Sequence, residues 1–266
     1  MALYKLHIYG NSFPYIFHNC ELDKTDHSRP HWHEAIEILA LEKGECRVAI
    51  NTNQFTAEKG DIVIINSGEV HSIMTNSGCR YYCAILEPEM WKNMGVDIKN
   101  IYFKEKITSP ELMKIFDEAG SEKRAKNEHY RQALMSMVSL IGIYILRNCV
   151  DTSYKGIGGA NLKKIQTVKK TLDYIEKNVC GPFSVEAAAK ELAFTKCYLC
   201  HVFKEITGMT IITYLNERRC DIAEKMIISG DMQISEVAMA CGFDNFSYFS
   251  RTYKKYKGTS PSKTKG

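Results

Sequence analysis

LAFTKCYLCHVFKEITG, residues 192–208, and GFDNFSYFSRTYKKYKG, residues 242–258, are two copies of one pattern, fifty positions apart. The matching residues include Tyr198 and Tyr248, Phe203 and Tyr253, Gly208 and Gly258, and, just upstream, Ala188 and Ala238. A repeat of this kind indicates two structural units of one design. Each unit reads as a short helix, a tight turn and a longer helix. This is the layout of a helix-turn-helix, in which the second helix enters the major groove of DNA.

In the first copy, the longer helix is predicted to begin after Thr195, whose hydroxyl can accept hydrogen bonds from the first backbone N–H groups. Apolar residues at helical spacing predict one buried stripe, formed by Leu199, Val202, Phe203 and Ile206. The opposite face collects the polar candidates for DNA contact, namely Cys197, His201 and Lys204, with Cys200 and Glu205 at its flanks. The Cys-x-x-Cys pair on this face is not enough for a zinc site, which needs four ligands.

In the second copy, Asp244 or Asn245 is predicted to cap the longer helix. The inward side chains are expected to be Phe249, Tyr253 and Tyr256, with Phe246 at the edge and Ser247, Arg251 and Lys254 outward. The fork of Arg251 fits the two acceptors of guanine, whereas Lys254 suits a phosphate as a point charge. On a single helix, a polar outer face usually means only contact with solvent. Two matched units with cationic outer faces favour DNA instead.

The segment between the copies, residues 210–229, carries apolar residues at helical spacing. A helix of ~18 residues is ~27 Å long, because each residue rises ~1.5 Å. A rigid connector of that length would hold two reading helices roughly one DNA turn apart, about 34 Å, on one face of the duplex. One chain is therefore predicted to read two adjacent major-groove segments.

Residues 161–266 resemble the AraC/XylS family of bacterial transcription regulators. The motifs that carry the resemblance are KELAFTKCYLCHVFKEITGMT, YLNERRCDIAEKMI and ISEVAMACGFDNFSYFSRTYKKYKGTSPS. The resemblance implies DNA contacts from both longer helices. Combined with the outward faces, it gives the candidates Lys196, Cys197, Cys200, His201, Lys204, Phe246, Ser247, Arg251 and Lys254. The chain departs from the family pattern at His201, where Arg is usual, at Cys200 for Ser and at Tyr253 for Phe, and these departures bear on which bases are read.

The first part of the chain reads as a β domain. Short β-branched or apolar runs predict strands at 36–41, 46–51, 61–65 and 81–86, and Gly or Asn clusters such as Lys43-Gly44 separate them. The even spacing favours a barrel or a double-sheet roll. From Pro110 onward the spacing becomes helical, and a long helix is expected at 128–149.

On a strand, His31, His33 and Glu37 would point to one face, so three ligand-type side chains would converge. With the later Gly60-Asp61 and His71, this spacing resembles the cupin fold, a small β-barrel whose interior can hold a divalent metal. The resemblance implies a ligand pocket lined by His31, Trp32, His33, Glu37, His71 and Tyr82. A metal on the three histidines and the glutamate is the less favoured alternative, because Asn66 stands where the cupin motif usually has Pro. The polar lining suits a hydroxylated ligand such as a sugar.

The predicted organisation is a two-domain α+β protein. A cupin-like sensor barrel is expected in residues 1–105 and a helical dimerisation segment in residues 106–150. A flexible linker is expected in residues 151–160 and the DNA-binding domain in residues 161–266. The long helix at 128–149 has apolar residues on more than one face, so it is expected either to pack on the β domain or to form part of a dimer interface.

Charge is distributed unevenly along the chain. Residues 1–160 hold 18 Lys and Arg against 20 Asp and Glu, whereas residues 161–266 hold 17 against 11. A basic C-terminal domain fits an anionic ligand such as DNA. The ten cysteines lack a regular framework, and residues 1–10 show no basic segment followed by an apolar run. We therefore expect a cytoplasmic protein that does not associate with a membrane.

The favoured hypothesis is an AraC-type transcription regulator that binds double-stranded DNA and a small-molecule effector. It is expected to be a homodimer, to have no catalytic activity and no resident cofactor, and to meet RNA polymerase as a further partner. One rival hypothesis is a cupin metalloenzyme, such as a dioxygenase or sugar isomerase, with a helical appendage. Another is a DNA-bending architectural protein without a sensor. Stoichiometric iron or manganese with turnover would favour the first rival, and sequence-independent DNA binding would favour the second.

Overall fold

The structure is a computed structural model that describes residues 14–23 and 27–264. The chain divides into two compact units, Met1–Ile157 and Gly158–Gly266. The N-terminal unit combines a β-sheet with helices, and the C-terminal unit is helical, so the expected two-domain α+β organisation is confirmed. The segment 1–10, in which no secretory signal was expected, lies outside the described residues. Within the described ranges, no helix is both long and apolar enough to cross a membrane.

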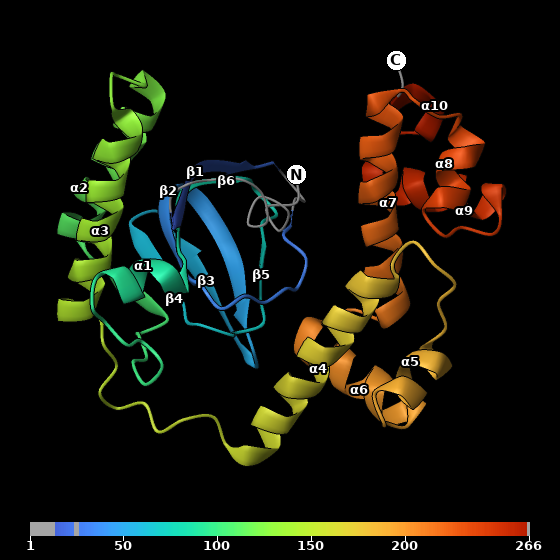
Figure 1. Cartoon of the computed structure of the whole chain (residues 1–266), viewed down its shortest axis with the longest axis horizontal. Coiled ribbons are helices and arrows are strands. Elements are labelled where there is room, and N and C mark those ends of the chain that lie inside the picture. The colour runs from blue at the N-terminus through green and yellow to red at the C-terminus, as the bar shows by residue number, and fades with distance from the viewer. Residues whose placement is uncertain (1–13, 24–26, 265–266) are drawn as a thin grey trace. The chain divides into compact units, whose positions relative to one another are not determined.

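The described part of the N-terminal unit contains the strands β1 (Tyr15–Leu22), β2 (Ile36–Ile50), β3 (Asn53–Glu58), β4 (Asp61–Ile65), β5 (His71–Met74), β6 (Cys79–Leu86) and β7 (Lys106–Thr108). Five of them are hydrogen-bonded in the order β1-β6-β2-β4-β7, and β3 and β5 pair with β2. The sheet is not closed into the expected barrel: among the described strands, no pairing joins the edge strands β1 and β7. It folds over along β2 instead, as Figure 1 shows.

Strand β2 is a single strand of fifteen residues where the sequence predicted two. Its first part pairs with β4 and β6, and its last part pairs with β3 and β5. The turn expected at Lys43-Gly44 is a local irregularity, because the register with β6 shifts between Leu41 and Lys43. Gly44 has a φ of 78°, and a Cβ there would lie 2.3 Å from the carbonyl oxygen of Gly78. Glycine therefore lets the strand bend between two halves of the sheet without breaking.

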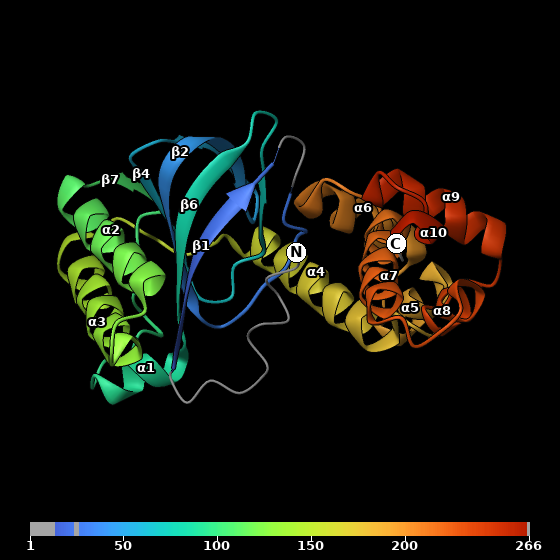
Figure 2. The ribbon, with the colours of Figure 1, turned by 90° about the horizontal axis from the view of Figure 1, so that it is seen from above.

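The alternation of side chains along β2, β4 and β6 creates two apolar layers. One layer lies between the sheet and the helices α1 (Pro88–Asn93), α2 (Pro110–Ala125) and α3 (Tyr130–Asn148), which Figure 2 shows on one side of the sheet. The other layer fills the fold between the halves of the sheet. Helix α3 packs on the first layer through Leu134, Val138, Ile141 and Ile145. Its outer side exposes Met135 and Leu140.

The first residues of the expected linker, 151–160, are attached to the N-terminal unit. The backbone N–H of Asp151 donates to the carbonyl of Tyr102 at 2.7 Å. The ring of Tyr154 stacks on that of Tyr102 with the centroids 3.5 Å apart. Helix α4 then begins at Gly159, so the stretch between the two anchored ends is shorter than the sequence predicted.

The C-terminal unit consists of helices α4 (Gly159–Asn178), α5 (Val185–Glu191), α6 (Lys196–Thr207), α7 (Ile211–Ser229), α8 (Ile234–Ala240), α9 (Phe246–Lys257) and α10 (Pro261–Thr264). Helices α5 and α6 form one helix-turn-helix, and α8 and α9 form the other. The long helix α7 connects them, and Figure 1 shows one pair near each of its ends. The repeat in the sequence therefore corresponds to two units of one design.

The offset between the two units is fifty residues in the second helices but forty-nine in the first. Equivalent positions that are forty-nine apart are the helix caps Ser184 and Gln233 and the left-handed turn residues Ala193 (φ 59°) and Gly242 (φ 83°). The predicted match of Ala188 with Ala238 is thus wrong by one position, and Ala188 corresponds to Val237. The second turn is longer than the first by one residue.

Candidate DNA-reading faces and candidate ligand site

Helix α6 has the cap and the buried stripe that its sequence predicted. The hydroxyl of Thr195 accepts a hydrogen bond from the backbone N–H of Tyr198 at 3.3 Å, and Gly208 ends the helix with a φ of 74°. The buried residues are Leu199, Val202, Phe203 and Ile206. These contacts fix the rotation of α6 about its axis, so its opposite face points to solvent.

The predicted contact residues of α6 lie on that outer face. Lys196, Cys197, His201 and Lys204 are exposed, and Cys200 is half-buried. Lys196 forms an ion pair with Glu186 of α5, and the Nε2 of His201 lies 3.7 Å from a carboxylate oxygen of Glu205. Within the described ranges no ion pair is recorded for Lys204. This face therefore offers one unpaired lysine, together with small and imidazole side chains.

Helix α9 is built in the same way. The side chain of Asn245 accepts from the backbone N–H of Tyr248 at 2.9 Å, so Asn245 rather than Asp244 is the cap. Phe249, Thr252 and Tyr253 are buried, and the predicted inward residue Tyr256 is half-buried. The outward residues Ser247, Arg251 and Lys254 are exposed, and Phe246 keeps 50% of its surface exposed. An exposed aromatic ring in the first turn of a reading helix suits contact with a thymine methyl group.

Three cations of α9, Arg251, Lys254 and Lys257, differ in their partners. The Nζ of Lys257 lies 2.8 Å from Asp221 and 2.7 Å from Glu224, both on α7, so this lysine holds the helices together. For Arg251 and Lys254, by contrast, no ion pair is recorded in the part of the chain that the structure describes. The charges of these two residues are therefore available to an external anion.

Buried polar contacts hold helix α7 to both helix-turn-helix units. Arg219 donates from Nε to the carbonyl of Val179 at 2.8 Å and from Nη2 to that of Gly181 at 2.7 Å, on the chain that leads into α5. Its guanidinium also lies 5.6 Å from the ring centroid of Phe243, in the turn before α9. Asn216 donates to the hydroxyl of Tyr248 at 2.7 Å. On the other side, the ring of Tyr214 on α7 lies 5.9 Å from that of Phe203 on α6, measured between centroids. Helix α7 thus contacts both reading helices, as the rigid connector required.

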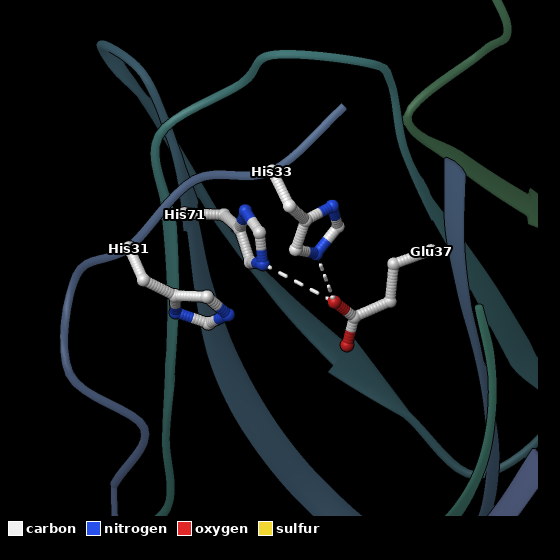
Figure 3. Close-up of side chains that lie close together, drawn as sticks. All are labelled: His31, His33, Glu37 and His71. Carbon is white, nitrogen blue, oxygen red and sulfur yellow. Dashed lines mark hydrogen bonds and ion pairs between the residues drawn. The ribbon is translucent and has the colours of Figure 1, made fainter. Parts of the chain in front are cut away.

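In the N-terminal unit, His31, His33, Glu37 and His71 come together as the sequence predicted, and we call these four residues the tetrad (Figure 3). Glu37 lies on β2, His71 begins β5, and the first two histidines precede β2. One ligand atom from each residue lies within 4.8 Å of all the others. The Oε2 atom of Glu37 is 2.9 Å from Nε2 of His33 and 3.3 Å from Nε2 of His71.

Backbone carbonyls fix the orientation of all three imidazoles. The Nδ1 atom of His31 lies 2.8 Å from the carbonyl of Arg29, that of His33 lies 3.0 Å from Ala35, and that of His71 lies 2.9 Å from Glu69. Because a carbonyl oxygen can only accept, each Nδ1 must carry a proton. A neutral imidazole in this position therefore keeps its lone pair on Nε2.

The charges within the tetrad are strongly coupled. Burial alone would raise the pKa of Glu37, but its contacts with His33 and His71 hold that pKa well below its usual value. Burial would lower the pKa of His33, yet the hydrogen bond to Glu37 and its charge raise it. Burial and the neighbouring His71 keep the pKa of His31 well below its usual value. An ionised carboxylate thus lies beside an uncharged imidazole.

The other two predicted lining residues are placed differently. Trp32, which stands between His31 and His33 in the sequence, is half-buried. Tyr82 does not reach the tetrad: it lies in the apolar layer against α2, where its ring stacks with those of Phe17 and Phe116. Successive residues of a strand point to opposite faces, so the neighbours of Tyr82, not Tyr82 itself, share the face of Glu37. Alternation along β6 separates these neighbours from Tyr82, and the pairing of Cys83 with Leu39 places them on the face of Glu37.

One of those neighbours, Cys83, is a site residue that the sequence interpretation missed. Its thiol donates to Oε1 of Glu37 at 3.4 Å. Oε1 of the carboxylate therefore accepts a hydrogen bond from the thiol, while Oε2 lies beside the imidazoles of His33 and His71.

The tetrad passes a chemical test for a divalent metal. The Nε2 atom of His71 is buried, and its neighbour is the carboxylate of Glu37, with Oε2 at 3.3 Å. Three imidazoles and one carboxylate are donors that Zn²⁺, Fe²⁺, Co²⁺ and Ni²⁺ accept. Each imidazole also donates its other N–H to a backbone carbonyl, which is the usual support of a metal-ligating histidine.

Comparison with known proteins identifies the family. A model described as a helix-turn-helix domain matches residues 188–266, and one described as an AraC-like ligand binding domain matches residues 20–137. The chain belongs to the AraC/XylS family of transcription regulators. The two matches cover the β domain with its first helices and both helix-turn-helix units, so the family resemblance read from the motifs is confirmed.

Relatives of this AraC/XylS regulator match most of its length. The uncharacterized HTH-type transcriptional regulator YdeC of Bacillus subtilis is 23% identical over 246 residues, 87% of this chain and 84% of that protein. The arabinose operon regulatory protein of Salmonella typhimurium is 23% identical over 235 residues, 83% of this chain and 79% of that protein. The crystal structure of ToxT from Vibrio cholerae with a bound unsaturated fatty acid has a TM-score of 0.51 at 14% identity. It covers 96% of each chain and supports the two-domain fold.

Proposed function

We propose that this AraC-type regulator reads two adjacent major-groove segments with the outer faces of α6 and α9. The contacts are assigned to Lys196, Cys197, Cys200, His201, Lys204, Phe246, Ser247, Arg251 and Lys254. The observation that carries the proposal is that α7 contacts α6 through Tyr214 and Phe203 and α9 through Asn216 and Tyr248, with both outer faces open. This arrangement suits a duplex read over about one helical turn.

The two faces are expected to contribute differently. Arg251 and Lys254 are outward cations of α9 without an ion pair among the described residues, and they suit one bidentate base contact and one phosphate contact. On α6, Lys196 is already paired with Glu186, so the charge that remains is chiefly that of Lys204. We therefore assign more of the electrostatic anchoring to α9, and more of the discrimination by shape and apolar contact to α6.

The N-terminal unit is proposed to bind a small polar effector at the tetrad. A hydroxylated molecule such as a sugar suits imidazole and carboxylate partners, and one relative is named for the arabinose operon. The apolar layer around Leu39, Val63 and Ile85 fills the interior of the fold, so a sugar would have to enter from the side of His31 and His33, which are partly exposed. Calorimetric titration with a panel of carbohydrates tests this assignment. If no carbohydrate of the panel gives heat of binding, the assignment of a sugar is refuted.

The remaining partners follow from exposed surface. Met135 and Leu140 on the outer side of α3 support a homodimer through this helix. RNA polymerase is assigned as a further partner and the cytoplasm as the compartment, in keeping with transcription regulation. The proposal includes no catalytic step, and metal-dependent turnover by the purified protein would contradict it.

The direct test is selection of bound sequences from random DNA, followed by titration of the selected duplex. The expected result is one preferred sequence, bound at least about 10³-fold more tightly than random duplex at the same salt concentration. Equal affinity for all sequences would refute specific reading and favour the architectural role.

A further inference from the structure

We propose that Cys197 and Cys200, near the start of α6, form a reversible disulfide that lowers the affinity of this reading helix for its DNA sequence. The inference rests on the proposed function and adds a redox regulation of the same DNA-reading face. The structure describes the reduced form, in which both cysteines are free thiols.

The first support is the spacing of the two cysteines along the helix. Both lie on α6, three residues apart. Residues at this spacing differ by ~300° in rotation and ~4.5 Å in height, which places their Cα atoms about 5 Å apart. A disulfide joins Cα atoms that are about 4.4–6.8 Å apart. The Cβ atoms of such a pair start about 5–6 Å apart and must approach to about 4 Å, so the turn has to tighten slightly.

The second support is that this turn can tighten at its start while its back is held. The first N–H groups of a helix have no acceptor inside the helix, and that of Cys197 is one of them. A shift of this N–H toward Cys200 therefore breaks no bond of the helix. The two intervening residues are held, because Leu199 is buried and the ring of Tyr198 lies 5.5 Å from that of Phe194.

The third support is the difference in exposure between the two thiols, which suits two successive steps of exchange with a small disulfide such as glutathione disulfide. Cys197 is exposed and Cys200 is half-buried. The thiolate of Cys197 attacks glutathione disulfide and releases one glutathione, and Cys200 then attacks Sγ of Cys197 and releases the second. Two electrons and two protons pass from the protein thiols to the glutathione disulfide.

The pair differs from the other cysteines of the chain. Six of the ten are buried, and the two others that reach the surface, Cys20 and Cys180, lie on separate segments. Only Cys197 and Cys200 thus combine access to an oxidant with a partner on the same element.

The disulfide is expected to change the reading face without removing the cations that anchor the domain. It removes two thiol groups and shifts the turn that carries Lys196 and leads to His201. Lys204 lies about one turn beyond the pair, and Arg251 and Lys254 lie on α9. Affinity for the selected operator should fall by about 10–100-fold, the cost of about one base pair that is no longer read. Affinity for random duplex should change by less than about twofold, because the phosphate contacts remain.

Linkage between oxidation and DNA binding gives a second expected result. If the disulfide weakens operator binding by a given factor, the operator must favour the reduced form by the same factor. A tenfold change in the equilibrium constant equals about 30 mV for a two-electron couple. Saturating operator should therefore raise the reduction potential of the pair by about 30–60 mV, whereas random duplex should raise it by less than about 10 mV.

The experiment is a redox titration of the full-length protein in mixtures of reduced and oxidised glutathione, with and without the selected operator. Trypsin cleavage after Lys196 and Lys204 releases residues 197–204, a peptide that contains both cysteines and no other. Mass spectrometry of this peptide distinguishes a disulfide, which has lost two hydrogen atoms, from a mixed disulfide with glutathione. Fluorescence anisotropy measures the operator affinity of each form.

Variants assign the response to the pair. Cys180→Ser, which removes an exposed cysteine outside α6, is the matched control and should keep the full response to oxidation. Cys197→Ser/Cys200→Ser should bind the operator with the same affinity in both buffers, whatever that affinity is. Cys200→Ser alone should accumulate the mixed disulfide at Cys197, because the thiol that resolves it is missing.

The inference is overturned if peptide 197–204 keeps both thiols in the most oxidising mixture, or if the disulfide forms and operator affinity changes by less than about twofold. An equal loss of affinity for random duplex would also overturn it, because the whole domain would then be disrupted. A reduced protein that binds operator and random duplex equally refutes the proposed function. A reduced protein that binds specifically and does not respond to oxidation refutes the redox regulation alone.

Discussion

Replacing Arg251 by Ala should weaken binding to the selected operator without weakening the fold. Arg251 is exposed on α9, and it forms no ion pair with another of the described residues. Its loss should therefore change the free energy of unfolding by no more than about 0.5 kcal/mol. A bidentate contact with guanine is worth about 1–3 kcal/mol of discrimination, so Kd should rise by about 5- to 150-fold and selectivity should relax at one base pair.

Two lysines of the same helix serve as controls. Lys254→Ala should weaken all duplexes similarly and reduce the salt slope of log K by about 0.9, because one phosphate contact is lost. Lys257→Ala should leave that slope unchanged. It should instead lower the free energy of unfolding by about 1–3 kcal/mol, because Asp221 and Glu224 lose their cation.

Fluorescence anisotropy at several salt concentrations measures the affinities, and urea titration measures the stabilities. An Arg251→Ala protein that binds the operator like its parent would refute the assignment of the outer face of α9. If Lys257→Ala reduces the salt slope as much as Lys254→Ala does, the assignment of Lys254 to a phosphate contact and of Lys257 to the ion pairs with α7 is refuted.

Three further predictions concern the fold. Arg219→Ala should lower the free energy of unfolding of the C-terminal unit by about 3–6 kcal/mol in urea titration, because two charge-assisted hydrogen bonds are lost; a change below about 1 kcal/mol would contradict its role as a clamp. The depressed pKa of Glu37 contributes stability that is present above about pH 4.3 and lost as the pH falls through the folded-state value. Tryptophan fluorescence should show this acid-side loss in the parent but not in Glu37→Gln, and identical profiles would refute it. Gly44→Ala should destabilise by about 3 kcal/mol or more, because its Cβ would meet a carbonyl oxygen at 2.3 Å. Gly60→Ala, with a φ of 93° and no atom near its Cβ, should cost only about 1–2 kcal/mol in the same assay, and equal losses would argue against the close approach at β2.

Local chemistry made the DNA-reading units predictable. Caps such as Thr195 and Asn245, the terminal glycines and the apolar stripes act within a few residues, so the sequence places each helix and its rotation. The sequence could not show that Lys257 is held by Asp221 and Glu224, because that contact joins α9 to α7. The sequence also did not show that the second turn is one residue longer than the first. The second helices of the two copies match closely at an offset of fifty, and this offset was applied to the first helices as well.

The N-terminal unit was less predictable because its structure depends on pairing between distant strands. The Lys43-Gly44 pair has the composition of a turn, yet the partners of β2 on both sides keep it within one strand. The tetrad was found because its spacing is distinctive. Tyr82 was misplaced because its side depends on the register of β6, and Cys83 was missed for the same reason.

The central claim is that α7 holds two reading helices at a fixed separation on one face of the duplex. Footprinting of the selected operator is expected to show two blocks of base pairs that the protein protects from cleavage, one for each reading helix. The direct measurement is the affinity of the full-length protein for this operator after about 5 or about 10 base pairs have been inserted between the two blocks. A rigid α7 cannot stretch to follow either insertion, so both duplexes should bind with the affinity of a single block. Full affinity after the insertion of about one turn, or protection of only one block in the parent operator, would contradict the claim.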